Sequence, residues 1–308
     1  MRILITGTAG MVGSALREFC TACGDEVFAY DHQTLNIAEP DDVRRAVDVT
    51  EPDAVINCAA WTDVDGCESD PEHAFAANAR GPQNLAAATR DVDAAFVTIS
   101  TDYVFDGTKG GFYTQEDEPN PQSVYGRSKL EGEFRSREKN SATIIVRSGF
   151  IFGPGGKNFL STVIHRARRG EPLKAITDSY GTPTYAYDLA RRLRELAQLK
   201  QPEIFHVANA GDGTSYAGFA REAILSAGLA EPRITGISAD SLNRPAPRPR
   251  NARLRCLYSQ DLGLSPLPDW RDSLREFVRI SSTGSIPRPE DYSKQASYPS
   301  AAGNKVTK

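Results

Sequence analysis

The chain of 308 residues lacks several features that mark common protein classes. It has no basic excess, because 36 Lys and Arg stand against 40 Asp and Glu, for a net charge of -4, whereas non-specific binding of nucleic acid needs a basic surface. No apolar run approaches the roughly 20 residues of a membrane-spanning helix. The first residues, MRILITG, already read as a buried strand, which leaves no room for a signal peptide. We therefore expect a soluble, cytoplasmic protein with neither a nucleic-acid nor a membrane partner.

Cysteine and histidine are too few and too scattered to predict a disulfide framework or a metal site. Four histidines accompany five irregularly spaced cysteines, which are Cys20, Cys23, Cys58, Cys67 and Cys256. Cys20 and Cys23 form a lone Cys-x-x-Cys pair, whereas a zinc or redox site would need a second pair or nearby histidines. Reduced, mostly buried thiols are therefore the prediction, with no residue assigned to a metal.

What the chain does have is a regular alternation of short apolar runs and amphipathic segments through its first half. Continuous apolar strands separated by amphipathic helices are typical of a parallel sheet that is covered on both faces. We therefore predict an α/β fold with a doubly wound parallel sheet of the Rossmann type. Strands are expected at 3–5, 27–30, 54–56, 95–99 and 143–146, and helices at 11–23, from Pro40, at about 72–89 and around Tyr125.

The pattern loosens beyond about residue 155. Further helices are expected near 159–169, 186–199, 215–227 and 270–280, with a short strand at 203–207. The segment RPAPRPR at 244–250 reads as a basic, extended stretch on the surface. We expect three parts: residues 1–155, a smaller C-terminal α/β region at 156–280 that is partly interleaved with the first part, and a flexible or surface-draped tail at 281–308.

A glycine-rich turn joins the first strand to the first helix. Gly7, Gly10 and Gly13 are spaced Gly-x-x-Gly-x-x-Gly, and glycine lets a backbone turn tightly and approach a pyrophosphate at the helix N-terminus. Asp31 ends the second strand about 20 residues farther on, where a carboxylate binds an adenosine ribose and repels a ribose phosphate. His32 partly offsets that repulsion, so NADH is favoured and NADPH stays open. The alternative is that Asp31 only forms a turn.

Three polar side chains are expected at the carboxyl edge of the sheet, where an open parallel sheet binds its ligand. Thr101 follows the strand at 95–99, within STDYVFDG. Tyr125 and Lys129 stand four residues apart in YGRSKLEGE, a spacing that places both on one face of a helix. An ammonium beside a phenol lowers the pKa of the phenol below its usual value of about 10. Such a pair exchanges a proton with a carbonyl oxygen or an alcohol near neutral pH.

These motifs together resemble the extended short-chain dehydrogenase/reductase superfamily and, within it, the dTDP-4-dehydrorhamnose reductases, which perform the last step of dTDP-L-rhamnose synthesis. STDYVF and YGTPT are more specific signs of this resemblance than the glycine turn or the Tyr-Lys pair. The resemblance extends over NCAAWTDVDGCE, FGPGGKNF, TDSYGTPTYAYDLA and LPDWRDSL, and so covers about residues 1–279. It implies that residues 1–155 form an NAD(P)-binding domain and that residues 156–280 mainly bind substrate.

The resemblance implies an NAD(P)H-dependent reduction of the C4 ketone of dTDP-4-dehydro-L-rhamnose. Tyr125 is then the proton donor, Lys129 lowers its pKa and binds the nicotinamide ribose, and Thr101 contacts the ketone oxygen. Asp102 and Phe150 are expected to contact the substrate. The residues expected to contact the cofactor, besides Tyr125 and Lys129, are Gly7, Gly10, Met11, Val12, Gly13, Asp31, Asn36, Ile37, Ala59, Ala60 and Trp61. Some relatives use Mg²⁺ at a subunit contact, so a magnesium ion and a homodimer are further expectations, without assigned residues.

Three positions depart from the family pattern. Phe150 stands where the family usually has the tryptophan of Arg-Thr-Ser-Trp, and it keeps an aromatic face but loses the indole N–H. Asn36 replaces a usual aspartate, and RPAPRPRNARL keeps the usual Arg-Pro and Asn only loosely. The first departure leaves another nucleotide-sugar reductase or an epimerase as an alternative. A regulatory subunit resembling that of methionine adenosyltransferase is a further alternative, against which the intact Thr, Tyr and Lys argue.

Overall fold

The computed structural model describes residues 1–155 and 159–283, and its centre is a six-stranded parallel sheet. The strand order is β2–β1–β3–β4–β5–β10. The strands are β1 (Arg2–Thr6), β2 (Glu26–Tyr30), β3 (Ala54–Asn57), β4 (Ala95–Thr101), β5 (Ile144–Ser148) and β10 (Ile204–His206). The order reverses between β1 and β3, and ligands of open α/β sheets bind outside the strand ends at such a point.

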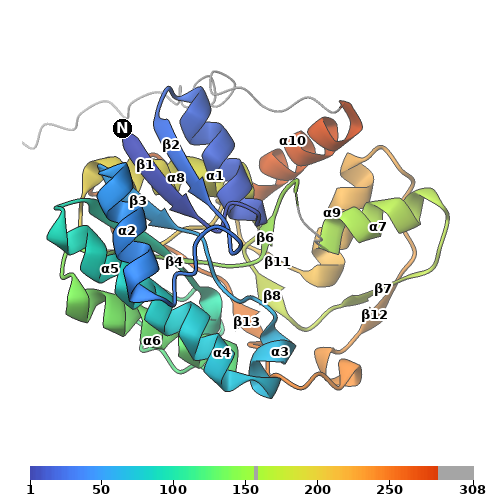
Figure 1. Cartoon of the computed structure of the whole chain (residues 1–308). Helices are drawn as coiled ribbons and strands as arrows, with labels where there is room; N and C mark the ends of the chain where they lie inside the picture. Colours follow the sequence, from blue (N-terminus) through green and yellow to red (C-terminus); the bar gives the residue numbers. More distant parts are fainter. Residues whose placement is uncertain (156–158, 284–308) are drawn as a thin grey trace, which may run out of the picture.

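Helices cover both faces of this sheet (Figure 1). On one face, α1 (Met11–Ala22) packs against α8 (Ala186–Leu199), and the other face carries α2 (Pro40–Thr50), α5 (Gly81–Asp91) and α6 (Val124–Lys139). Side chains of a strand alternate between the two faces. Ile3 and Ile5 of β1 therefore join the apolar cluster under α1 and α8, while Leu4 joins the cluster under α2 and α5. The predicted doubly wound parallel sheet is confirmed.

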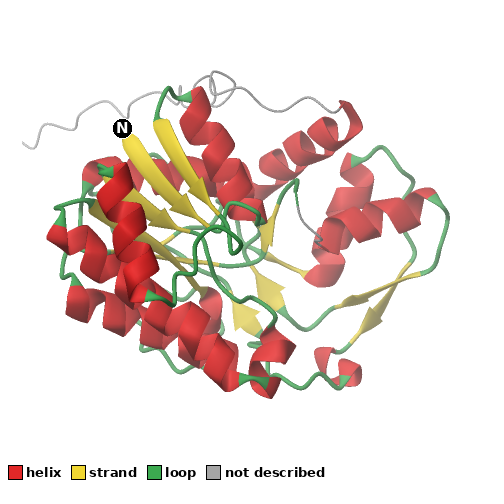
Figure 2. Ribbon diagram, in the orientation of Figure 1, coloured by secondary structure: helices red, strands yellow, loops and turns green. Residues whose placement is uncertain are grey.

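The chain beyond β5 builds a smaller region beside the carboxyl edge of the sheet, on the right in Figures 1 and 2. Its helices are α7 (Phe159–Arg168) and α9 (Tyr216–Ser226), and its strands are β6 (Ile151–Phe152), β7 (Leu173–Ile176), β8 (Tyr180–Gly181), β9 (Thr184–Tyr185), β11 (Thr214–Ser215), β12 (Ile234–Ile237) and β13 (Asn251–Ala252). They form small sheets with the orders β11–β8–β13, β12–β7 and β6–β9. Between these pieces, α8 and β10 return to the main sheet, so the two parts are interleaved in sequence.

The last described helix, α10 (Trp270–Thr283), closes the smaller region against α9. Trp270 packs edge-on against Phe219, and Phe277 packs against Phe152. The tail expected from residue 281 begins inside this helix, and residues 284–308 lie outside the described residues, as do 156–158 of the FGPGGKNF motif. In residues 1–155 and 159–283, no helix is long and apolar enough to cross a membrane.

The prediction of one regular helix at about 72–89 is wrong. It consists of α4 (Pro71–Phe75), a π-helical segment (Ala76–Arg80) and α5, with a separate short helix α3 (Val64–Ser69) before it. Pro82 lacks a backbone N–H and crowds the preceding turn, so the regular bond pattern cannot continue through it. The N–H of Gly81 instead bonds to the carbonyl of Ala76, five residues back. Such π-bulges often lie at functional sites.

Two further expectations are modified by the structure. The segment 244–250 lies only partly on the surface: Ala246 and Pro249 are buried, and Arg248 forms an ion pair with Asp65 of α3. All five cysteines are free, but only Cys20 and Cys67 are fully buried.

Candidate active site

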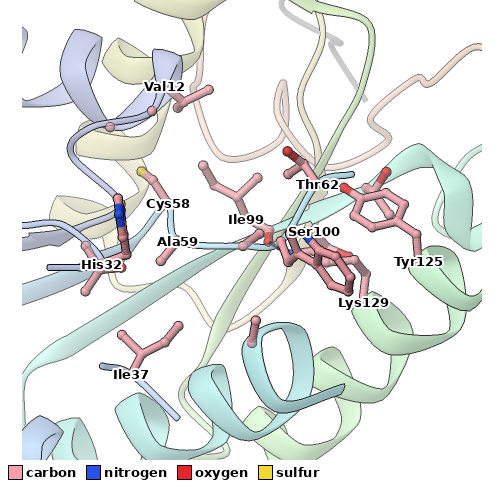
Figure 3. A pocket seen from close by; sticks show the side chains of 18 of the residues that line it. Val12, His32, Ile37, Cys58, Ala59, Thr62, Ile99, Ser100, Tyr125 and Lys129 are labelled. Carbon is pink, nitrogen blue, oxygen red and sulfur yellow. Dashed lines mark hydrogen bonds between the residues drawn. The ribbon is translucent and has the colours of Figure 1, made fainter. Parts of the chain in front are cut away.

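A cavity of about 980 Å³ opens at the carboxyl edge of the sheet. Its walls come from the turns after β1, β2, β3, β4 and β5 and from the first turns of α6. Figure 3 shows residues along its length, from Val12, His32 and Ile37 at one end, past Cys58, Ala59 and Ile99, to Tyr125 and Lys129 at the other. The volume lies at the upper end of the range for ligand pockets, and the elongated arrangement suits a dinucleotide.

The turn from β1 to α1 is tightly packed and has no room for a side chain at Gly7 or Gly13. Gly7 has a φ of +71°, and a Cβ on it would lie 2.6 Å from the Ala59 nitrogen. A Cβ on Gly13 would lie 2.2 Å from the Gly7 carbonyl oxygen. Gly10 caps α1 without a side-chain hydrogen bond, so the first N–H groups of the helix stay available to an anion. Lining the cavity here are Gly7, Gly10, Met11, Val12 and Gly13.

Asp31 stands at the same end of the cavity and organises its own turn. Its Oδ1 accepts hydrogen bonds from the backbone N–H of Gln33 at 3.0 Å and from the Thr34 hydroxyl at 2.9 Å. The bond from the Thr34 hydroxyl is the main cause that holds the pKa of Asp31 below its usual value. The turn role that was the alternative for Asp31 is therefore present, and the ribose contact stays a prediction.

Asn36 and Ile37 complete this end as predicted lining residues. The Asn36 side chain accepts a hydrogen bond from the backbone N–H of Ala38 at 3.1 Å, and the Ile37 carbonyl accepts one from Asn84 of α5 at 3.0 Å. Sequence reasoning missed Arg80, which lines the same cavity from the end of the π-helical segment. Nothing in the sequence near Asp31 signals Arg80, because tertiary packing alone brings α5 beside the β2 turn.

The structure brings together the three residues predicted as the chemical centre. Thr101 is the last residue of β4, and Tyr125 and Lys129 lie in the first two turns of α6. All three line the cavity, and Thr101 hydrogen-bonds Tyr125. The Lys129 Nζ donates to the Ile99 carbonyl at 2.7 Å, which ties the ammonium to β4. Ser123 caps α6 by accepting a hydrogen bond from the Gly126 N–H at 3.1 Å, which fixes where the helix begins.

The predicted lowering of the Tyr125 pKa is wrong. Burial raises the pKa of Tyr125, and the hydrogen bond from Thr101 opposes this only in part. Burial also lowers the pKa of Lys129 to about 8, while the negative charge of Glu133 acts in the opposite direction. Sequence spacing predicts that the two groups are neighbours but not that both are removed from water, and desolvation is the larger effect here.

Asp102 lies directly behind Thr101 and is only 4% exposed. The Thr101 hydroxyl donates to Asp102 Oδ1 at 3.0 Å. Burial raises the pKa of Asp102 to about 7, against the lowering effect of that hydrogen bond. A neutral carboxyl at this place would not oppose negative charge that develops beside Tyr125.

Behind the cavity lies a buried ion pair that sequence reasoning missed. The Glu133 carboxylate of α6 accepts a hydrogen bond from Arg147 Nη2 of β5 at 2.6 Å. Ser100 of β4 also donates to Glu133. One signal was available: Glu133 follows Lys129 by four residues, as Lys129 follows Tyr125, so the three share a helix face.

The strand end after β3 forms the middle wall. Ala59, Ala60 and Trp61 line the cavity as predicted. The Trp61 backbone is held at both of its polar groups by Asn78 of the π-helical segment, with distances of 2.8 Å to the N–H and 3.0 Å to the carbonyl. Asn78 was not among the predicted residues, and its irregular helical turn is what directs its amide toward this wall.

Phe150 lines the cavity from the turn after β5 and has an unusual φ of +50°. Its ring contacts Tyr216 at 4.5 Å and Phe219 at 5.1 Å between centroids, both on α9. The aromatic face expected at this position is therefore present, and it joins the sheet to the smaller region. The structure offers no site for the expected magnesium ion within 1–155 and 159–283, because no group of three or more His, Cys, Asp or Glu there could hold a metal ion.

Known proteins share this sequence and fold. Residues 1–282 match the family described as the RmlD substrate binding domain. A dTDP-4-dehydrorhamnose reductase from Mycolicibacterium smegmatis is 38% identical over 293 residues, which cover 94% of this chain and 89% of that protein.

Solved structures agree with the sequence match. A dTDP-4-dehydrorhamnose reductase from Clostridium acetobutylicum has a TM-score of 0.87 and 37% identity, covering 92% of this chain and 100% of that chain. One from Bacillus anthracis, in complex with NADP, has a TM-score of 0.86 and 31% identity, covering 90% of this chain and 98% of that chain. With its glycine turn, its Thr-Tyr-Lys centre and these matches, the chain belongs to the dTDP-4-dehydrorhamnose reductase family.

Proposed function

We propose that this protein reduces the C4 ketone of dTDP-4-dehydro-L-rhamnose to the alcohol of dTDP-L-rhamnose, with NADPH or NADH as reductant. The observation that carries the proposal is the convergence of Thr101, Tyr125 and Lys129 at one end of the cavity whose other end is the glycine turn. The M. smegmatis and C. acetobutylicum relatives bear the name of this activity.

The residues present fit a nicotinamide dinucleotide. Gly7 and Gly13 let the turn pack closely against the Ala59 backbone and against itself, and the uncapped helix N-terminus offers N–H groups to a pyrophosphate. Ala59 and Ala60 leave room in the middle of the cavity. When bound, the dihydronicotinamide supplies the hydride that goes to C4 of the sugar.

The protein supplies the proton and stabilises the charge that develops on the ketone oxygen. As the hydride arrives at the carbon, the oxygen gains negative charge, and the Tyr125 O–H gives it a proton. The raised pKa of Tyr125 keeps the phenol protonated at neutral pH, which is the form a proton donor needs. Thr101 adds an oriented hydroxyl, and an ammonium on Lys129 stabilises the phenolate that remains until a solvent proton replaces the one given.

The test is oxidation of NADPH and of NADH with dTDP-4-dehydro-L-rhamnose, measured for the wild type and for Tyr125→Phe. Loss of the phenol hydroxyl should cost about 10²- to 10⁴-fold in turnover, the usual contribution of a positioned proton donor, with cofactor binding nearly unchanged. Tyr103→Phe is the matched control, because Tyr103 lines the same cavity and packs edge-on against Tyr125 at 5.7 Å. Equal turnover of wild type and Tyr125→Phe would overturn the mechanism.

Phe150 favours a second candidate that differs only in substrate. In place of the family's usual tryptophan, it makes the wall by the smaller region less broad and removes an N–H donor. Another dTDP-sugar with a C4 ketone is therefore the second candidate, and a panel of such ketones distinguishes it by the ratio of kcat/KM values.

The same assay tests the epimerase alternative, because an epimerase would not consume the reductant stoichiometrically. The intact Thr101, Tyr125 and Lys129 argue against a purely regulatory subunit.

A further inference from the structure

One face of α6 carries three ionisable residues in a row: Tyr125, Lys129 and Glu133, each four residues after the last. The first two line the cavity, whereas Glu133 does not and is only 4% exposed. Because Glu133 does not line the cavity, it is not placed to contact substrate or cofactor. It lies one helical turn after Lys129, so any effect on the reaction would act through the charge of Lys129.

Glu133 is fixed from two strands. Arg147 Nε donates to Oε1 at 3.0 Å, Arg147 Nη2 donates to Oε2 at 2.6 Å, and the Ser100 hydroxyl donates to Oε1. Ser100 and Arg147 are direct neighbours in the register of β4 and β5. Ser100 also precedes Thr101, so the same cluster holds the strand end that carries the third chemical residue. Replacing such a buried pair by apolar residues is often neutral or stabilising, so stability alone is a weak reason for its presence.

We propose that Glu133, held in place by Arg147 and Ser100, is a positioning residue that keeps Lys129 in its ammonium form beside Tyr125. This inference rests on the function proposed above. Lys129 has lost most of its water and has one fixed hydrogen-bond acceptor, the Ile99 carbonyl at 2.7 Å. A neutral amine there would neither stabilise a phenolate nor donate strongly to a ribose hydroxyl.

The charged and titratable groups around Lys129 determine the signs of the expected effects. Glu133 and Tyr125 share its helix, Cys58 lies at the end of β3, Asp102 follows β4, and Arg147 lies on β5. Burial is the largest influence and lowers the pKa of Lys129 to about 8; Glu133 and then Cys58 act to raise it. Removing the Glu133 charge leaves Arg147 positive and unpaired, which favours a neutral Lys129. Removing the Arg147 charge leaves Glu133 negative, which favours the ammonium.

The experiment measures the alkaline limb of the pH profile of kcat/KM, together with the pH dependence of NADPH binding, for four variants. They are Glu133→Gln, Arg147→Gln, the double variant, and Glu131→Gln as a control on the same helix. Glu131 pairs with Arg135, but both side chains are 37% exposed and its loss changes no buried charge. We expect Glu133→Gln to move the limb down by on the order of one pH unit and Arg147→Gln to move it up by less. The double variant should move it down, by less than Glu133→Gln does, because Glu133 acts on Lys129 more strongly than Arg147 does, and the control should match the wild type.

Opposite shifts are what a merely structural role cannot produce, because both single variants would then only lower stability and activity. An unchanged limb in Glu133→Gln, or shifts of the same sign in both single variants, would overturn the inference. If Glu133→Gln does not fold, Arg147→Lys and Arg147→Gln decide the matter, since equal limbs in these two would also overturn it. A wild type that binds NADPH but reduces no ketone would instead refute the proposed function, and the pH dependence of NADPH binding would still test Glu133.

Discussion

Asp65 and Arg248 are 183 residues apart in the sequence and form a two-pronged ion pair, with Arg248 Nη1 to Asp65 Oδ1 at 3.0 Å and Nη2 to Oδ2 at 2.8 Å. The backbone N–H of Ala246 adds a third hydrogen bond to Asp65, also at 3.0 Å. Asp65 lies on α3, just after the β3 wall of the cavity, and Arg248 belongs to the smaller region. The pair therefore ties the two sides of the site together near Tyr103 and Tyr216.

Asp65→Asn should loosen this tie. The hydrogen bond from Arg248 is the main cause that lowers the pKa of Asp65 to about 2, so its contribution to stability is complete above the unfolded value of about 3.8 and is lost as pH falls toward 2. Because the pair is partly exposed, we expect a loss of about 1 kcal/mol at most in the free energy of unfolding at pH 7. Urea denaturation should show a constant difference from the wild type between pH 8 and pH 5. A difference that grows on acidification would contradict the assignment.

Thr101→Val and Thr101→Ser form a matched pair that separates the hydroxyl from the methyl group. Valine keeps the shape but removes the hydroxyl that donates to Asp102 and is hydrogen-bonded to Tyr125, so turnover should fall by about 10²- to 10³-fold, as for loss of one donor to a developing oxyanion. Serine keeps the hydroxyl and should retain most of the turnover. Steady-state kinetics of the two variants provide the check, and similar losses in both would show that packing, not the hydroxyl, is what matters.

Asp102→Asn should change how stability depends on pH. The folded pKa of about 7 lies above the ordinary value of 3.8, so the folded state holds its proton more tightly and loses stability as pH rises through this range. Between pH 5 and pH 8 the wild type should lose on the order of 2–3 kcal/mol relative to the variant, which cannot ionise. Asp106→Asn is the control, because its pKa is lowered to about 2 and it does not titrate in this window. Parallel pH dependence in wild type and Asp102→Asn would refute the shift.

Much of this site follows from the sequence because parallel topology gathers distant motifs. The glycine turn, Thr101 and the Tyr125–Lys129 step lie after or beside strands whose carboxyl ends meet at one edge, so their convergence needs only the sheet to be predicted correctly. The helix from Pro40 and the helix at 186–199 were expected at the residues where they begin in the structure. Local sequence signals are enough to predict a helix or strand where a glycine, a proline or a regular spacing of apolar residues marks where it begins or ends.

The rest depends on burial and on contacts that no local pattern encodes. Tyr125 and Lys129 were correctly paired, but the direction of the Tyr125 pKa depends on exclusion of water by the surrounding protein. The Glu133–Arg147 pair requires the packing of α6 on β5. The π-helical segment that directs Asn78 toward Trp61 arises from Pro82 inside an otherwise regular Ala-rich pattern, where a straight helix was the simpler prediction.

The end of the cavity expected to hold the adenosine ribose is lined by two residues of opposite charge, Asp31 and Arg80. Asp31 favours a free ribose, whereas Arg80 lines the same cavity and could bind a ribose phosphate, as an arginine does in NADP-binding sheets of this kind. We expect Arg80→Ala to raise the KM for NADPH by about tenfold or more, the effect of losing a charged hydrogen bond, and to leave the KM for NADH nearly unchanged.

Arg90→Ala is the control, since Arg90 pairs with Asp91 at 2.7 Å on α5. Equal changes for both cofactors would mean that Arg80 acts on the shape of the adenine end and does not contact a phosphate.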